Sequence, residues 1–472
     1  MERRSRALAA LSFGSLFVLK LPLLALPYHW DEAGAYVSRA LWLADSGLHR
    51  ALPGLHPPTQ FFGHPPGLYL LLASAYRLFG HSIWLTHLVA VTLGATTLYL
   101  TFRVGERIGG SAAAFVSALF LLLNPLFFAQ AGLMHGDMAV AALGLAATLF
   151  YLEERRLPYF VSAVALLLAK ETGLGIVVGI AVYHALVRSD RPRHLREAVV
   201  LATPGLMLAA FFAASWITTG RLLNNSYFDT NTLVTLSFEK VRWVSRWLFV
   251  EQGRWILTAC TVVALTFGRR EYRFRELPLL ALVVIPFWAA FGALYVLPRY
   301  LLPAFPFLSV AAGLGVVALG RRWKLVPVVA VIAAGASFAL TIDGTREGSG
   351  SYENNLEYVD VVETHRELAA WLEAHHQGAV IAAGWPLGQV LREPRLGYVS
   401  VPLNSASTHQ HPEILAWTAQ GDAFTQSLVA RAEGERWEIL ERFENGGKVA
   451  AAFGRPARRP VRRHLPEKGT VR

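Results

Sequence analysis

The sequence predicts an all-α polytopic membrane domain followed by a small α/β domain outside the membrane. Of its 472 residues, 54% are apolar and only 16% are charged, where a soluble domain carries about 25% charged residues. Long apolar runs fill residues 1–341, and from residue 342 the charge is ordinary and no run could span a membrane. The one cysteine, Cys260, cannot form an intrachain disulfide. These features exclude a disordered chain, a disulfide-built secreted module and an ordinary cytosolic enzyme.

About eleven transmembrane helices are expected. Their apolar runs cover residues 7–27, 82–102, 111–129, 138–152, 158–169, 173–188, 197–217, 253–268, 277–297, 300–319 and 324–341. Several runs are shorter than the ~20 residues that a span needs. A further run at 66–79 is predicted to be an interfacial or re-entrant element. The first run has a basic start but no small-x-small cleavage site before Tyr28, so it is predicted to be a retained span and not a signal peptide.

Basic residues predict the orientation of these helices. With the N-terminus in the cytoplasm, six short inside segments contain 18 Lys and Arg residues, whereas the outside segments at 130–137 and 170–172 contain none and one. The net charge of +11 is therefore a topology signal and not a nucleic-acid footprint. The Arg-rich, Ala/Leu-rich usage indicates a bacterium with a GC-rich genome, which places the chain in the inner membrane and its C-terminal domain in the periplasm.

Residues 342–454 are predicted to form the periplasmic α/β domain. Its expected elements are a helix over 360–376, strand-like runs at 379–383 and 397–401, a helix near 411–433, and a hairpin of 437–443 and 448–453 around Asn445-Gly446-Gly447. The basic tail, residues 455–472, is predicted to be disordered and solvated. The alternative is that this tail binds anionic lipid headgroups.

The candidate catalytic residues are acidic and lie on the predicted outer side. The first outer loop, residues 28–65, brings Asp31 and Glu32 to the headgroup level, where a water-soluble acceptor could meet a lipid-borne donor. Adjacent carboxylates raise one another's pKa, which suits a general base. Residues 33–44 have apolar side chains at helical spacing, which predicts a helix in the membrane surface. Asp137 opens another apolar helix, and either aspartate could instead be a helix N-cap.

Cations lie on the same predicted side. Lys170 interrupts the apolar stretch 158–188 and faces outward as a cation for a lipid-linked phosphate; the alternative is a structural pair with Glu171. Arg299 and Tyr300 form the outer mouth between two spans, where a guanidinium can bind phosphate with two hydrogen bonds. A plain interfacial anchor is the alternative there. Lys20, inside the first span, is expected to snorkel toward the outer surface.

Other site types have less support. The chain has neither a Walker A loop nor a dinucleotide glycine fingerprint, and no Cys/His set has zinc-ligand spacing. The sequence therefore indicates no definite cofactor. One open alternative is a divalent metal in the first outer loop, where four histidines accompany the acidic pair: His29, His49, His56 and His64.

These motifs occur together in one order over residues 1–341. The acidic pair is followed by His64-Pro65-Pro66, the outward Asp137, the split helix pair with Lys170, and Arg299-Tyr300-x-x-Pro. The set resembles the GT-C superfamily of membrane glycosyltransferases, and most of all the branch of protein O-mannosyltransferases and lipid A aminoarabinose transferases. The resemblance implies transfer of a sugar, with inversion, from a polyprenyl-phosphate donor to a hydroxyl of a lipid, glycan or protein acceptor on the outer face.

The resemblance also implies residue roles. Asp31 would be the general base, and Glu32 and Asp137 would shape the acceptor or base site. The donor phosphate would be bound by His64, Lys170, Arg299 and Tyr300. Charge develops on the leaving phosphate in the transition state, so fixed cations there would lower the barrier. His64 departs from the aminoarabinose branch, which often has lysine at this position.

Two other functions remain as alternatives, a transporter or flippase and a polysaccharide polymerase or ligase that handles lipid-linked sugars. A transporter should have ionisable groups near the membrane midplane and a repeated topology. In this sequence the ionisable groups gather at the outer interface and no internal repeat is found.

Overall fold

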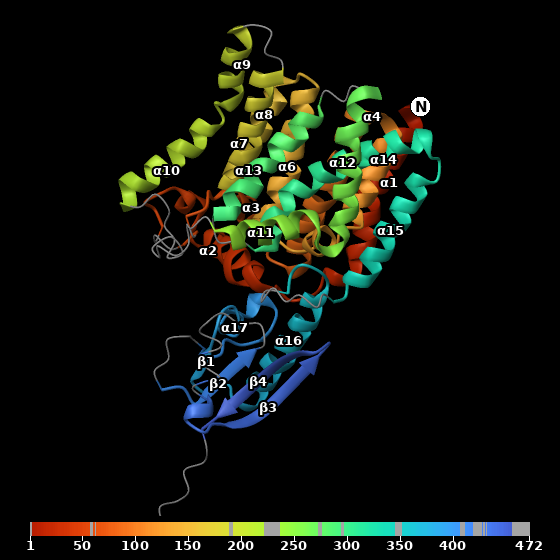
Figure 1. Cartoon of the computed structure of the whole chain (residues 1–472). Helices are drawn as coiled ribbons and strands as arrows, with labels where there is room; N and C mark the ends of the chain where they lie inside the picture. Colours follow the sequence, from red (N-terminus) through yellow and green to blue (C-terminus); the bar gives the residue numbers. More distant parts are fainter. Residues whose placement is uncertain are drawn as a thin grey trace, which may run out of the picture. The chain divides into compact units, whose positions relative to one another are not determined.

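The computed structural model describes residues 2–56, 60–61, 63–187, 192–220, 237–271, 276–293, 297–344, 352–405, 411–418, 427, 430 and 432–455. The chain divides into two compact units (Figure 1). The first comprises Met1–Val362 with Arg395–Gly397, and the second comprises Glu363–Pro394 with Tyr398–Arg472. The predicted basic tail lies, after Arg455, outside the described residues.

The first unit is helical. Its α-helices are α1 (Glu2–Lys20), α2 (Ser38–Ser46), α3 (Gly67–Phe79), α4 (Ile83–Leu122), α5 (Pro125–Gln130), α6 (Gly136–Leu152), α7 (Arg156–Ala169), α8 (Leu174–Val187), α9 (Pro192–Ala202), α10 (Gly205–Thr219), α11 (Phe238–Phe249), α12 (Arg254–Glu271), α13 (Leu277–Ala293), α14 (Phe305–Arg322) and α15 (Val326–Thr341). Short 3₁₀ turns are η1 (Leu21–Leu23), η3 (Leu48–Ala51), η4 (Glu171–Gly173), η6 (Glu251–Gly253) and η7 (Pro298–Ala304), and η2 (Glu32–Val37) is a π-helical turn.

The helices follow the predicted apolar runs, with two differences in how runs are joined. The runs at 82–102 and 111–129 fall largely on α4, whose backbone breaks at Gly110 (φ 79°), and end in α5. The run at 197–217 covers parts of α9 and α10, which are bent by 42°. The amphipathic α11 was not predicted, because its charged residues interrupt the apolar pattern.

Two described helical stretches are long and apolar enough to cross a membrane, Ile83–Leu122 and Pro298–Arg322, and the bent pair of α9 and α10 could be a third. Seven other apolar helices in the described part have 10–17 residues. The count of about eleven spans therefore stays a prediction. The predicted element at 66–79 is the helix α3.

Small residues let the central helices approach closely. A Cβ on Gly313 of α14 would lie 2.9 Å from the carbonyl oxygen of Ala113 in α4, and one on Gly179 of α8 would lie 2.6 Å from the oxygen of Leu282 in α13. Such close backbone approach is typical of membrane helix pairs. The tight packing of α14 matters for the site, because η7, which carries Arg299, leads directly into it.

The predicted helix of the first outer loop is present as η2 and α2. Of the residues at its predicted apolar face, Ala33, Val37 and Ala40 are fully buried in the first unit, and Ala44 at its end is half-buried. This burial fixes the backbone that follows Asp31.

The second unit contains most of α16 (Glu357–His375), the short α17 (Leu387–Val390) and a four-stranded sheet. The strands β1 (Ile381–Ala383), β2 (Ile414–Thr418), β3 (Glu438–Asn445) and β4 (Lys448–Gly454) lie in the order β1-β2-β4-β3. The β1–β2 pair is parallel and the other pairs are antiparallel. The predicted hairpin is confirmed, with Gly446 and Gly447 both at positive φ as its two-residue turn requires.

Two predictions for this unit are wrong. The predicted strand at 397–401 is a bent loop, because the amides of Ser400 and Val401 donate to the Glu373 carboxylate (both 2.8 Å) instead of to a neighbouring strand. The predicted helix near 411–433 is wrong for its first part, which is strand β2, whereas the described residues 427, 430 and 432–433 are helical as predicted. A short, buried apolar run is compatible with a helix and with a strand. Here the run is a strand because its backbone pairs with β1 on one edge and with β4 on the other.

Candidate active site

Asp31 lies directly before η2 and its side chain makes no capping hydrogen bond. Asp31 is therefore the N-cap residue by position, as the alternative has it, but its side chain does not cap the helix. Its carboxylate, 24% exposed, instead forms an ion pair with the guanidinium of Arg299. The preceding residue, Trp30, has φ +46°, a left-handed conformation that non-glycine residues adopt at an energetic cost and that is common at functional sites.

Arg299 is the centre of a buried charge cluster. Besides Asp31, its guanidinium contacts Glu353 (Nη1 to Oε2, 2.7 Å) and Asp137 (Nε to Oδ2, 3.5 Å). Arg299, Asp137 and Glu353 are all almost completely buried. A buried ionised side chain is tolerated only when it is paired, and here three carboxylates surround one guanidinium. This burial and pairing of Arg299 do not fit the alternative that it is a plain interfacial anchor.

Lys170 is the second cation of the cluster. It occupies the extended residue that separates α7 from η4 and α8, and its Nζ lies 2.7 Å from Asp137 Oδ1. Burial lowers the pKa of Lys170, but Asp137, Tyr300 and Glu171 together outweigh that effect and raise it, so the ammonium stays charged. The ammonium also lies 4.4 Å from the ring centroid of Tyr300. The ion pair of Lys170 is thus with Asp137, whereas its neighbour Glu171, the partner in the alternative, pairs with His64 and feels the Lys170 charge only from a distance.

Asp137 lies inside the first turn of α6, after the N-cap residue His135. It caps no helix with its side chain, since its two oxygens face Lys170 and Arg299. The N-cap alternative is therefore wrong for this residue.

His64 lies outside this cluster and pairs with Glu171 (Nδ1 to Oε2, 2.9 Å). Burial would raise the pKa of Glu171, but the His64 ring and Lys170 lower it to about 2. A Cβ on Gly67 would lie 2.6 Å from the Leu168 carbonyl oxygen, so the start of α3 packs directly on the end of α7. The ion pair of His64 with Glu171 therefore links the Pro65-Pro66 segment to the turn between α7 and α8, which contains Lys170.

Glu32 is fully buried and does not join Asp31 in contacting Arg299. Its carboxylate accepts hydrogen bonds from the amides of Met134 (2.8 Å) and His29 (3.2 Å) and lies 3.2 Å from His87 Nε2. The two neighbouring carboxylates have separate partners, so the geometry does not support mutual crowding. Glu32 links the first outer loop to the loop that carries Asp137.

Two members of the cluster were not identified in the sequence. Glu353 lies in a polar stretch after the last apolar run, where it resembles any surface glutamate. His135 belongs to the Met134–Asp137 motif, but no role was assigned to it. Burial and the nearby Arg299 lower the pKa of His135 well below its usual range, so the ring is neutral. Its Nδ1–H donates to Gln130 Oε1 (2.7 Å), and Nε2 faces Arg299 Nη1 at 3.5 Å.

Two further expectations concern the histidines of the first outer loop and Lys20 of the first predicted span. Among the described residues, the histidines of the first outer loop form no group of three metal ligands with Asp31 and Glu32. Lys20 does not snorkel: it is fully buried, and its Nζ lies 4.1 Å from the ring centroid of Phe128.

Comparisons with known proteins agree with the predicted resemblance. Residues 63–217 match the family model described as dolichyl-phosphate-mannose-protein mannosyltransferase. ArnT from Cupriavidus metallidurans, solved with undecaprenyl phosphate, is similar over 94% of this chain and 97% of its own, with a TM-score of 0.62 and 15% identity. An oligosaccharyltransferase of Archaeoglobus fulgidus, solved with zinc and sulfate, is similar over 86% of this chain and 58% of its own, with a TM-score of 0.51 and 13% identity.

No curated protein matches the chain in sequence. The family match and the two solved structures together confirm the resemblance to the GT-C superfamily, with ArnT as a similar structure. At these identities the similarity establishes the fold and not the reaction.

Proposed function

We propose that the chain is an integral-membrane glycosyltransferase that moves a sugar from a polyprenyl-phosphate donor to an acceptor hydroxyl, with inversion. The observation that supports this most is the buried cluster in which Arg299 and Lys170 meet carboxylates at the ends of separate helices. In a fold shared with a protein solved with undecaprenyl phosphate, two fixed cations of this kind suit the phosphate of a lipid-linked sugar.

The cations would act on the leaving group. As the bond between the anomeric carbon and the phosphate oxygen breaks, its electron pair stays with the phosphate, whose negative charge grows. Arg299 offers the N–H groups of Nη2, the nitrogen that Asp31 occupies, and Lys170 offers a compact charge. Both cations are held in place by buried partners before the substrate binds. Cations that need no reorganisation stabilise the transition state more than the ground state.

Asp31 would be the general base. Of the three carboxylates on Arg299, only Asp31 is partly exposed, so a donor phosphate can replace it at the guanidinium at least cost. The released carboxylate then accepts the proton of the acceptor hydroxyl, whose oxygen attacks the anomeric carbon from the face opposite the phosphate. This single displacement inverts the anomeric centre.

The remaining parts of the proposal concern location and partners. The N-terminus would lie in the cytoplasm of a bacterium, the chain would cross the inner membrane several times, and residues 342–454 would form a periplasmic domain. The acceptor would be a lipid, a glycan or a protein that reaches the outer headgroup level. Glu32 and Asp137 would position the outer loops and the cations.

The test measures release of free polyprenyl phosphate. Purified protein in lipid is given a panel of polyprenyl-phosphate sugars, with a membrane extract as the source of acceptor. Asp31→Asn should reduce turnover by about 10²-fold or more, as expected on loss of a general base. Asp45→Asn is the matched control, because Asp45 lies in the same loop but is exposed and pairs with Arg395. Unchanged turnover in Asp31→Asn would contradict the proposed base.

A further inference from the structure

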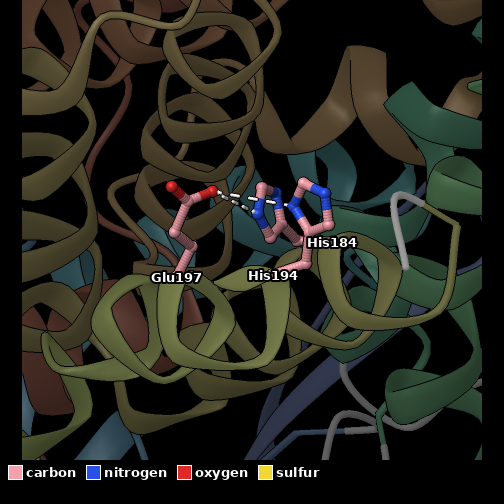
Figure 2. A group of neighbouring side chains, drawn as sticks. All are labelled: His184, His194 and Glu197. Carbon is pink, nitrogen blue, oxygen red and sulfur yellow. Dashed lines mark hydrogen bonds and ion pairs between the residues drawn. The ribbon is translucent and has the colours of Figure 1, made fainter. Parts of the chain in front are cut away.

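A second group of ionisable side chains lies away from the candidate active site. His184 of α8 and His194 and Glu197 of α9 point toward one another (Figure 2), and their ligand atoms all lie within 4.8 Å of one another. His184 Nε2 is 3.2 Å and His194 Nδ1 is 3.7 Å from the same carboxylate oxygen, Glu197 Oε2. We propose that these three side chains bind a Zn²⁺ ion that joins α8 to α9.

The spacing of the three ligand atoms fits zinc. Zinc binds histidine nitrogen and carboxylate oxygen at about 2.0–2.2 Å in a tetrahedral arrangement. Ligand atoms at that radius are separated by about 3.4 Å, by the geometry of a tetrahedron. The two nitrogen-to-oxygen separations, 3.2 and 3.7 Å, lie on either side of this value, and all three ligand atoms lie within 4.8 Å of one another. Two histidines and one glutamate leave a fourth position for water.

Hydrogen bonding alone does not account for the convergence of the two rings. His194 Nδ1 is too far from the carboxylate for a hydrogen bond, and among the described residues it has no hydrogen-bond partner at all. Arg156 Nη2 lies 3.8 Å from Oε1, the other oxygen of Glu197, and so approaches the carboxylate from the side away from Oε2. A cation between the rings and Oε2 would satisfy all three groups.

The surroundings of His184 resemble the outer shell of a metal ligand. Its Nδ1 lies 3.0 Å from the hydroxyl of Tyr151, at the end of α6. When Nδ1–H donates to this oxygen, Nε2 keeps its lone pair and faces Glu197. Second partners of this kind fix the tautomer and orientation of histidines that bind metals. The hydroxyl of Tyr159 donates to the carbonyl of Leu201 (2.7 Å) and holds the end of α9 in place.

The position of the group indicates a structural metal. Asp137 and Tyr151 lie near opposite ends of α6, and their 14-residue separation spans about 21 Å at 1.5 Å per residue. The metal would therefore lie far from the donor-phosphate cations, on the predicted cytoplasmic side. Its role would be to hold α9, which is rich in polar residues, against the apolar α8.

The experiment uses the full-length protein without an affinity tag, treated with a chelator and then titrated with zinc. We expect one Zn²⁺ per chain by elemental analysis, and intense visible absorption when Co²⁺ replaces it, which reports tetrahedral geometry. His194→Gln should weaken zinc binding at least tenfold. Because His194 Nδ1 has no hydrogen-bond partner among the described residues, the metal-free variant should melt like metal-free wild type. His49→Gln, in the first outer loop, is the control and should bind zinc as wild type does.

A second measurement separates binding from folding. Zinc should raise the melting midpoint of wild type and of His49→Gln, and leave that of His194→Gln and Glu197→Gln unchanged. Equal zinc binding in wild type and His194→Gln would overturn the proposal, as would the absence of a bound metal in wild type.

Discussion

The ion pair between Lys170 and Asp137 allows a direct test of how the candidate active site is held together. Both side chains are buried and their charged atoms lie 2.7 Å apart. Lys170→Met preserves the length of the side chain and removes its charge. Asp137 is then left with Arg299 Nε at 3.5 Å as its remaining cation, and Arg299 is shared with two other carboxylates.

The expected cost follows from burial. Removal of one partner from a buried pair costs about 3–5 kcal/mol, because the remaining charge is uncompensated. Lys170→Met should therefore be destabilised by about this amount. When Asp137→Asn is added, the uncompensated charge is gone, so the double variant should be less destabilised than the sum of the single variants by about 2–3 kcal/mol. The exposed Lys324→Met should cost less than about 0.5 kcal/mol.

The assay is denaturant unfolding of the purified protein in detergent, followed by tryptophan fluorescence, for wild type, the two single variants, the double variant and the Lys324 control. A positive coupling between Lys170 and Asp137 is the expected result. Strict additivity would show that the two side chains do not depend on each other, and a Lys170→Met variant as stable as wild type would refute the argument from buried charge.

Three further predictions concern neighbouring residues. Arg299→Lys keeps the charge but loses the two-pronged donor, so it should fold and release polyprenyl phosphate at least ~10-fold more slowly than wild type in the turnover assay. Burial lowers the pKa of His135, so this ring stays neutral in the folded chain, whereas in the unfolded chain it takes up a proton below pH 6.5. The contribution of His135 to the free energy of unfolding is therefore complete above pH 6.5 and is lost as the pH falls. Between about pH 7.5 and pH 5 the melting midpoint of His135→Gln should fall less than that of wild type. Glu32→Gln weakens the charge-assisted bond from the Met134 amide, so urea unfolding should show a loss of about 1–3 kcal/mol, while the folded fraction keeps its turnover within a few-fold.

Much of the candidate site could be predicted because its residues follow the ends of apolar helices. Asp31, Asp137, Lys170 and Arg299 each lie where an apolar run begins or ends on the same predicted side, and the structure brings all four into one cluster. Parity of the spans is enough to place such residues at one membrane face. The packing of the helices decides which of these side chains are in contact. Glu353 also belongs to the cluster, but it lies in a polar segment that has no periodic pattern.

The errors have physical causes as well. In sequence, a carboxylate at a helix start fits a capping role and an ion pair equally well. Asp31 pairs with the Arg299 guanidinium, and Asp137 pairs with the Lys170 ammonium, because buried cations lie beside them. The sequence predicts a helix where strand β2 lies, because a short apolar run shows neither a helical nor a strand period. Lys20 was expected to reach water, but it packs against Phe128 inside the first unit.

The charges of the cluster bear on how a donor could bind. Two cations, Arg299 and Lys170, face three carboxylates, and His135 adds no charge because it is neutral. The group as a whole is thus not positive, so a phosphate cannot be attracted by net charge and must exchange with a carboxylate. Asp31 is the one that can leave, because it alone reaches solvent. The same exchange frees the proposed base, which would couple the binding of the donor to activation of the acceptor hydroxyl and require the donor to bind first.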